Sequence, residues 1–217
     1  MADTYQILYR GGTGEITEKK SRFIAHTFPV HSEEEALSHI AAIKKEYWDA
    51  RHNCYAFVCG PRQELQRFSD DGEPAGTAGK PILEVLLREE IHDCLIVVTR
   101  YFGGTLLGTG GLVRAYQRSS QEGLAASTII PRGTGTLYTI SADYNQFGRI
   151  RHYLEDRKLP LLEVRYQQDV ELDVILTEET LDPVQKAAAD LTSGAAVFTE
   201  LGPVTFGILD GEVFLLE

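Results

Sequence analysis

The chain has 217 residues, of which 43% are apolar and 24% are charged, a composition that is ordinary for a globular protein of one large or two small domains. Its apolar runs span only a few residues, against the roughly 20 of a membrane-spanning helix, and its first residues lack a secretory signal pattern, so we expect a cytoplasmic protein without a membrane segment. The formal net charge of −11 is uneven, because residues 136–217 carry −9 of it, and this acidity argues against nucleic acid wrapping around the C-terminal part.

Two short strands are predicted over residues 13–31, and a helix follows them. Ser32 and Glu35 have the spacing of a capping box, in which the two side chains satisfy free backbone N–H groups at the helix start. The helix is expected from about residue 33 to residue 47. Its apolar positions recur at helical spacing and are Leu37, Ile40, Ile43 and Tyr47.

A strand from Cys54 to Cys59 is predicted next, and it places these two cysteines on opposite faces. We therefore interpret Cys54, Cys59 and Cys94 as buried thiols in a reducing compartment, without a disulfide or a shared metal ion. The run from Cys94 to Thr99 is continuous and rich in β-branched residues, which predicts a central strand buried on both faces.

Two glycine-rich loops, Phe68–Lys80 and Arg100–Gly111, contain eight glycines between them. Glycine loses more backbone entropy on ordering than any other residue, so such loops are usually kept where the backbone turns sharply or approaches something closely. Pro81 is expected at the first position of a helix after the first loop. A second helix is expected after the other loop, from Thr109 or Gly110 to about Ala126.

Residues 128–135 carry turn signals and mark the expected domain boundary. Strands and helices then alternate in the order β-α-β-β-α-β, which is the ferredoxin-like unit. Asn145 is expected to cap the first of these helices, Asp182-Pro183 to begin the second, and Thr205–Leu209 to form an edge segment. We therefore predict an α+β protein of two domains, over residues 1–132 and 136–217.

Neither glycine-rich loop fits a nucleotide-binding template. The Walker pattern fails at Gly79-Lys80 because Pro74 and Pro81 occupy the positions that require Gly and Ser or Thr. The match to the dinucleotide fingerprint is weak, because Gly108-Thr-Gly110 is followed by Val113 where the third Gly belongs and no acidic residue lies about twenty positions further on.

A more general anion site is compatible with the second loop. A helix that starts near Gly110 offers free N–H groups and a positive dipole end, and Gly110 and Gly111 would let a phosphate or carboxylate approach closely. Gly103 and Gly104 belong to the same loop, and Thr109, Arg100 and Arg114 could bind the anion as well. The alternative is that Thr109 only caps the helix and the glycines only allow tight packing.

Three acids of the first loop, Asp70, Asp71 and Glu73, also allow two interpretations. Closely spaced carboxylates are typical ligands of Mg²⁺ or Ca²⁺. They could equally form ion pairs with Arg67, Lys80 or Arg100 and hold the two loops together, and the turn at Gly72 and Pro74 favours this because it splays the acids. We predict no resident metal and no cofactor.

Arg51 and His52 precede a strand, where His52 could act as a base or simply lie at a sheet edge. The serines, histidines and cysteines are scattered and show neither the order of a catalytic triad nor metal-ligand spacing. No catalytic residue is predicted.

Four stretches of this sequence resemble the IMPACT family, specifically its bacterial YigZ-type branch: Lys20–Ala25, Asp49–Cys54, Phe68–Pro81 and Val98–Tyr116. The resemblance implies an N-terminal domain like the second domain of ribosomal protein S5, and a C-terminal ferredoxin-like domain similar to a late domain of elongation factor G. It also implies a connection with translation, because the eukaryotic member is a translation regulator that binds a large activator protein and thereby restrains a kinase. It supplies no catalytic residue.

Two functional hypotheses follow. The first is a non-catalytic, translation-associated regulator that binds RNA, the ribosome or a translation factor through the N-terminal loops. The second is a small-molecule enzyme or sensor that holds a phosphate-like anion at the helix start near Thr109–Gly111.

Overall fold

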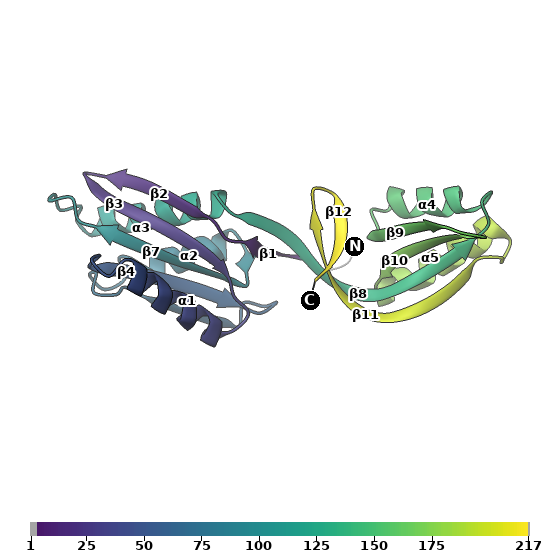
Figure 1. Cartoon of the computed structure of the whole chain (residues 1–217), viewed down its shortest axis with the longest axis horizontal. Coiled ribbons are helices and arrows are strands. Elements are labelled where there is room, and N and C mark those ends of the chain that lie inside the picture. Colours follow the sequence, from purple (N-terminus) through teal and green to yellow (C-terminus); the bar gives the residue numbers. More distant parts are fainter. Residues whose placement is uncertain (1–3, 217) are drawn as a thin grey trace. The chain divides into compact units, whose positions relative to one another are not determined.

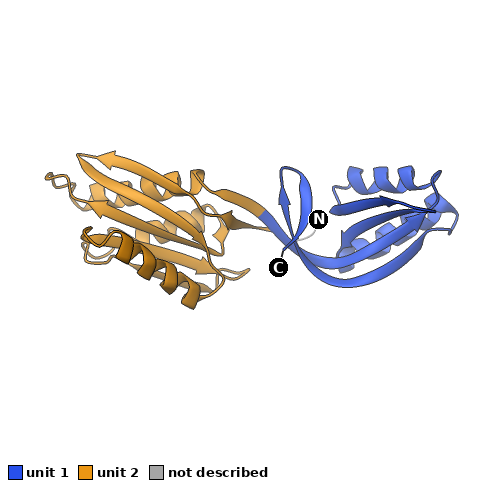
Figure 2. Ribbon diagram, in the orientation of Figure 1, with its two compact units in different colours: residues 1–4, 131–217 blue, residues 5–130 orange. Residues whose placement is uncertain are grey.

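The computed structural model describes residues 4–216 and divides into two units (Figures 1 and 2). The N-terminal unit is Tyr5–Ile130, and the C-terminal unit comprises Thr4 and the described residues from Pro131 onward. Both units combine helices with β-sheet, so the predicted α+β class is confirmed. None of the helices within residues 4–216 is long and apolar enough to cross a membrane.

The sheet at the centre of the N-terminal unit has five antiparallel strands in the order β2-β3-β7-β4-β5. Their bounds are Thr13–Glu18 for β2, Ser21–Pro29 for β3, His52–Cys59 for β4, Leu65–Ser69 for β5 and Cys94–Tyr101 for β7. The central position of β7 confirms the strand predicted from its continuous apolar run, because Cys94 to Arg100 are all buried. Two further short strands, β1 (Tyr5–Arg10) and β6 (Ile91–His92), pair in parallel.

Helices cover both faces of this sheet. One face packs against α2 (Gly79–Arg88) and α3 (Thr109–Ala125), and the other packs against α1 (Glu33–Glu46). Cys54 lies in the first core and Cys59 in the second, as the strand pattern predicts, and the three cysteines are free and buried.

The capping prediction for α1 is confirmed in part. Ser32 Oγ accepts the N–H of Glu35, but the Glu35 carboxylate accepts the N–H of His31 rather than that of Ser32. The apolar stripe is wrong at Leu37, which is 50% exposed because Ala36 occupies the core position on that turn.

The starts of α2 and α3 also differ from the prediction. Helix α2 begins at Gly79, so Pro81 is its third residue and not its first. Gly108 is the N-cap of α3, with φ of 74°, and Thr109 makes no side-chain capping bond. A residue with a side chain is strained at this positive φ, which explains why glycine takes the position.

The sheet of the C-terminal unit has the antiparallel order β12-β11-β8-β10-β9. The strands are β8 (Thr128–Ala142), β9 (Leu161–Tyr166), β10 (Val170–Leu176), β11 (Val197–Leu209) and β12 (Glu212–Leu216). One apolar core joins the sheet to α4 (Phe147–Asp156) and α5 (Glu178–Thr192), and a smaller apolar cluster surrounds Phe206. The predicted order β-α-β-β-α-β is present, with β12 added at its end.

Four local predictions in this unit are wrong. Residues 128–135 are extended within β8 and form no turn, although the division between the two units does fall in this segment, after Ile130. Thr205–Leu209 is not an edge segment, because it lies within β11 and pairs with β12, and its first three residues also pair with β8. Asp143, not Asn145, accepts the N–H groups at the start of α4. Helix α5 starts after Thr177, which leaves Pro183 inside it.

Candidate functional site

The strands of the N-terminal sheet bring the predicted site residues to one end of the unit. Because neighbouring strands are antiparallel, Glu18 is paired with Ser21, and Arg100 is paired with both Phe23 and His52. We call this region, made of residues 18–22, 47–52, 69–80 and 100–114, the loop end. It contains all the residues selected from the sequence: Arg51, His52, Asp70, Asp71, Glu73, Lys80, Arg100, Gly103, Gly104, Thr109, Gly110, Gly111 and Arg114.

Asp70 organises the start of α2. Its Oδ1 accepts the N–H groups of Ala78 and Gly79 at 3.0 and 2.8 Å, and its Oδ2 accepts the N–H of Gly76 at 2.8 Å. The carboxylate therefore caps the start of α2, which begins at Gly79 and not at Pro81 as predicted. Its negative charge also balances the positive end of the helix dipole.

Asp71 links the first loop to the rest of the unit. Its Oδ1 lies 2.6 Å from Lys44 Nζ, and its Oδ2 accepts the N–H of Asn53 at 2.7 Å. The backbone oxygen of Asp71 lies 2.9 Å from His52 Nδ1. His52 is thus held against the loop, and both acids are used inside the structure.

Glu73 lies at the centre of a buried polar network. Its Oε1 accepts hydrogen bonds from Arg100 at 2.5 Å and from the Tyr116 hydroxyl at 2.9 Å, and the Cys54 thiol lies 3.3 Å from that hydroxyl. Burial raises the pKa of both Tyr116 and Cys54, so both remain protonated donors at neutral pH. Tyr116 and Cys54 were not selected from the sequence, because nothing in their spacing connects them with Glu73.

These contacts support the second interpretation of the three acids, in which they hold the loops together. Within the described residues, no group of three or more His, Cys, Asp or Glu side chains is placed to hold a metal ion. Arg100 is 7% exposed and paired with Glu73, so its guanidinium does not face the surface.

Basic side chains remain at the surface of the loop end. They are exposed and, within residues 4–216, join no hydrogen bond or ion pair: Lys19, Lys20, Arg51, Lys80 and Arg114. The loop end contains seven Lys and Arg residues against five Asp and Glu residues, so it carries a small excess of positive charge on a chain whose net charge is −11.

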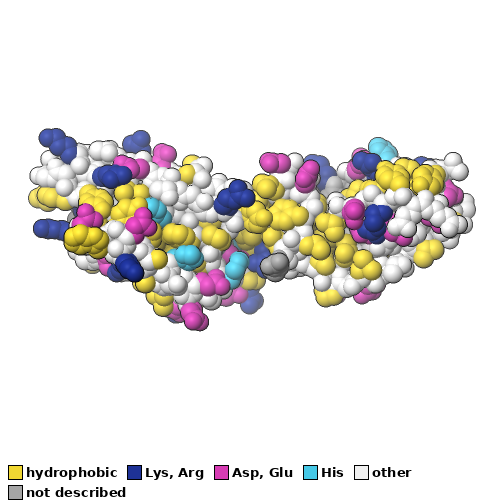
Figure 3. Space-filling model, viewed as in Figure 1, with side chains coloured by type: hydrophobic (Ala, Val, Ile, Leu, Met, Phe, Trp, Pro, Cys, Tyr) yellow, Lys and Arg dark blue, Asp and Glu magenta, His cyan; other side chains and the backbone are white. Residues whose placement is uncertain are grey.

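Large apolar side chains are exposed beside these cations. Trp48 is 81% exposed, Phe68 48%, Phe102 51% and Leu106 83%. On the face shown in Figure 3, dark blue basic side chains and yellow apolar side chains lie together at the left of this unit. The sequence contains one indication of this surface. Phe102 and Leu106 are large apolar residues in a glycine-rich loop, where no helix or strand pattern would bury them.

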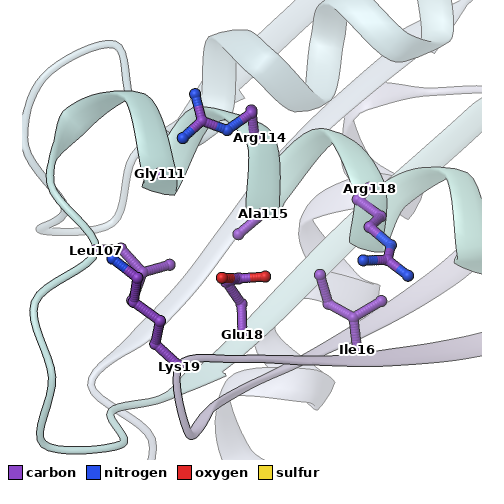
Figure 4. Close-up of a pocket in the computed structure, with 8 residues that line it drawn as sticks. All are labelled: Ile16, Glu18, Lys19, Leu107, Gly111, Arg114, Ala115 and Arg118. Atoms are coloured by element: carbon purple, nitrogen blue, oxygen red, sulfur yellow. The ribbon is translucent and has the colours of Figure 1, made fainter.

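A small pocket lies between α3 and the end of β2 (Figure 4). Its volume is about 230 Å³, and Ile16, Leu107 and Ala115 form its apolar part. Lys19, Arg114 and Arg118 line it as well, with Glu18 lying between Lys19 and Arg118. Gly111 reaches the pocket, whereas Thr109 and Gly110 are exposed outside its lining.

Comparison with known proteins identifies related chains. The family model of the Impact N-terminal domain matches residues 19–124, and a domain of unknown function (DUF1949) matches residues 140–195. The chain is 40% identical to IMPACT family member YvyE of Bacillus subtilis over 206 residues, which cover 95% of this chain and 94% of the relative. It is 38% identical to IMPACT family member YigZ of Escherichia coli over 179 residues, which cover 82% and 88% of the two chains. A crystal structure of a hypothetical protein, 34% identical in sequence, superposes with a TM-score of 0.59 and covers 91% of this chain and 97% of the other.

Proposed function

Because this chain belongs to the IMPACT family, we propose that it is a translation-associated regulator that binds RNA, alone or within the ribosome, through the loop end. The family's eukaryotic member is a translation regulator, which supports the connection with translation. The cytoplasm is the matching location for such a role.

One observation carries the RNA proposal: unpaired cations and exposed aromatic rings share the loop end. Lys20, Arg51 and Lys80 are free to contact phosphates, and cation–phosphate contacts supply most non-specific affinity. Trp48 and Phe102 offer faces on which unpaired bases can stack, at about 1–3 kcal/mol for each base. A mixture of basic and aromatic side chains is typical of surfaces that bind single-stranded nucleic acid.

Two finer assignments of fold are part of the proposal. The antiparallel order β11-β8-β10-β9 supports a ferredoxin-like domain over residues 136–217. The assignment of residues 1–132 to the ribosomal protein S5 type rests on the sequence motifs. Both folds occur in translation proteins, which favours a role near the ribosome without determining it.

The test is ribosome cosedimentation together with fluorescence anisotropy on a single-stranded RNA, each at two salt concentrations. The variant Arg51→Gln/Lys80→Gln should weaken binding and lower the slope of log affinity against log salt by roughly one for each lost phosphate contact. The matched control is Arg62→Gln/Arg88→Gln, which removes two exposed charges from the opposite end of the same unit. No association at low salt, or equal losses in the two variants, would contradict the proposal.

A second candidate function follows from the pocket in Figure 4. Lys19, Arg114 and Arg118 surround an apolar floor, which suits a small molecule with a phosphate-like group and an apolar body. A thermal-shift screen with sugar phosphates and nucleotides tests it, since a ligand at a hundred times its dissociation constant adds about 2.7 kcal/mol of stability. Arg118→Gln should abolish any such shift because Arg118 lines the pocket, and it should leave RNA binding unchanged because Arg118 lies outside the loop end.

A further inference from the structure

The backbone on both sides of Phe102 is anchored, although the Phe102 side chain is 51% exposed. The preceding residue, Tyr101, ends β7, and its hydroxyl donates to Asp49 Oδ1 at 2.8 Å. The following residue, Gly103, donates its N–H to Ser21 Oγ at 3.1 Å. Gly103 also packs so closely on the turn between β2 and β3 that a Cβ would not fit there. Phe102 is therefore held at a fixed place on the surface of the loop end.

The ring of Phe102 is positioned by Arg100. The guanidinium carbon lies over the Phe102 ring, 5.7 Å from its centroid, where a cation and an aromatic ring attract each other. The same carbon lies 5.3 Å from the centroid of the buried Phe23 ring, and the guanidinium is paired with Glu73. Arg100 is thus fixed by buried partners and covers one face of Phe102, so the ring exposes its other face.

The other large apolar side chains of this surface lack such support. Trp48 is 81% exposed, and among residues 4–216 its ring contacts no other aromatic ring and no cation. Leu106 is 83% exposed and lies in the irregular part of the second loop. Ordering a free side chain on binding costs free energy, and a ring that is already fixed avoids most of this cost. Phe102 is therefore the preorganised aromatic face of the loop end.

A free cation begins beside this ring. A Cβ on Gly103 would lie 2.0 Å from the carbonyl carbon of Lys20, so the backbone of Lys20 touches the residue after Phe102. The Lys20 side chain is exposed and joins no hydrogen bond or ion pair within the described part of the chain. Its flexible four-carbon stem can reach the phosphate of a nucleotide whose base lies on Phe102. Arg100 cannot supply this contact, because it is 7% exposed and paired with Glu73.

We propose that Phe102 and Lys20 together hold one unpaired RNA nucleotide and that Arg100 is a positioning residue for this contact. The inference rests on the proposed RNA-binding function and assigns its principal base contact. The base stacks on the free face of Phe102, and the phosphate pairs with Lys20. Arg100 touches neither group of the nucleotide. It holds the ring in the orientation that stacking requires, and Glu73 in turn holds Arg100.

Fluorescence anisotropy with a short single-stranded oligouridylate, at two salt concentrations, tests the nucleotide contact. Phe102→Leu should weaken binding about tenfold at both concentrations and leave the slope of log affinity against log salt unchanged, because a stacked base is lost but no phosphate contact. Lys20→Gln should instead lower that slope by about one. The matched control is Tyr166→Leu, which removes a 57% exposed aromatic residue from the C-terminal unit and should leave the affinity unchanged.

A double-variant comparison tests the positioning role of Arg100. Arg100→Lys keeps a positive charge opposite Glu73 but lacks the planar guanidinium against the Phe102 ring. It should weaken binding several-fold without a change in the salt slope. It should have no further effect in the Phe102→Leu background, because the two changes act on one contact. NMR of the unsubstituted protein keeps the test independent of how well Arg100→Lys folds, since the Phe102 ring protons and the Arg100 Nε–H should both shift as the RNA binds.

The outcomes separate this inference from the function on which it rests. If the unsubstituted protein binds no RNA at low salt, the proposed function and the inference are both contradicted. If it binds RNA but Phe102→Leu and Tyr166→Leu have equal affinities, the inference alone is overturned. An effect of Arg100→Lys that adds to that of Phe102→Leu and lowers the salt slope would show that Arg100 contacts phosphate directly, which overturns its positioning role.

Discussion

Glu73 Oε1 lies 2.5 Å from a guanidinium nitrogen of Arg100, and the two side chains are only 3% and 8% exposed. The pair joins the first glycine-rich loop to the end of β7, from which the second loop departs. It buries one acid and one base together, so it leaves the net charge of the outer surface unchanged. The ion pair therefore fixes the position of the two loops relative to each other.

Breaking this pair should destabilise the N-terminal unit strongly. Glu73→Gln leaves the Arg100 charge buried without its partner, and we expect the free energy of unfolding to fall by about 3–5 kcal/mol. Urea unfolding followed by circular dichroism measures the loss. The double variant Glu73→Gln/Arg100→Met should lose less than the sum of the single variants. Additive losses would show that the two charges are not coupled.

Asp70 should stabilise the same unit through the start of α2. Asp70→Ala removes the acceptor for three backbone N–H groups and should cost about 1–2 kcal/mol, in the range of lost helix caps. Asp70→Asn keeps one oxygen in place and should cost less. A thermal or urea denaturation series on the two variants gives this ranking, and a reversed order would contradict the capping role.

Gly103 should tolerate a side chain far less than its neighbour Gly104. A Cβ on Gly103 would lie 2.0 Å from the carbonyl carbon of Lys20, so Gly103→Ala must push the second loop away from the β2–β3 turn. Gly104 has φ of 82° but open space around it, so Gly104→Ala should cost only about 1 kcal/mol of backbone strain. The urea midpoint of unfolding should fall further for Gly103→Ala than for Gly104→Ala. The opposite order would show that the positive φ of Gly104 matters more than the close contact of Gly103 with Lys20.

The sequence predicts those parts of the fold where local pattern and burial agree. The apolar run Cys94–Thr99 predicts a buried strand, and the apolar stripe of α3 predicts a helix. Both predictions are correct because β7 is buried on both faces and α3 is buried along one face. Turn signals mislead where long-range pairing decides, as in residues 132–135, which pair with β11 in an extended strand. Strand β6 has only two residues, too few to show a strand period, and its pairing with β1 joins segments far apart in the chain.

The sequence locates the candidate site but does not predict which side chains in it contact one another. Motifs locate the two loops, and antiparallel pairing explains why all the selected residues meet at one end. The partners of each charge cannot be read from spacing, because Asp71 binds Lys44 and Glu73 binds Tyr116 across long stretches of chain.

Asp173 should make the stability of the C-terminal unit sensitive to acid. Burial by itself would raise the pKa of Asp173, but hydrogen bonds from Arg165 and Thr139 outweigh it and hold the pKa below its ordinary value. A carboxyl group with a lowered pKa stabilises the folded state above its unfolded pKa of about 3.9, and this contribution disappears as the pH falls through the folded pKa.

Asp173→Asn should therefore reduce the free energy of unfolding by about 1–3 kcal/mol at pH 7. The difference from the unsubstituted protein should begin to shrink below about pH 4, where the unfolded carboxyl takes up a proton, and should disappear at a pH below the folded pKa, where the carboxyl is protonated in both states. Amide hydrogen exchange along β10 at several pH values measures this. Asp169→Asn, an exposed substitution on the same hairpin, is the control, and a difference at Asp173 that does not change with pH would contradict the electrostatic explanation.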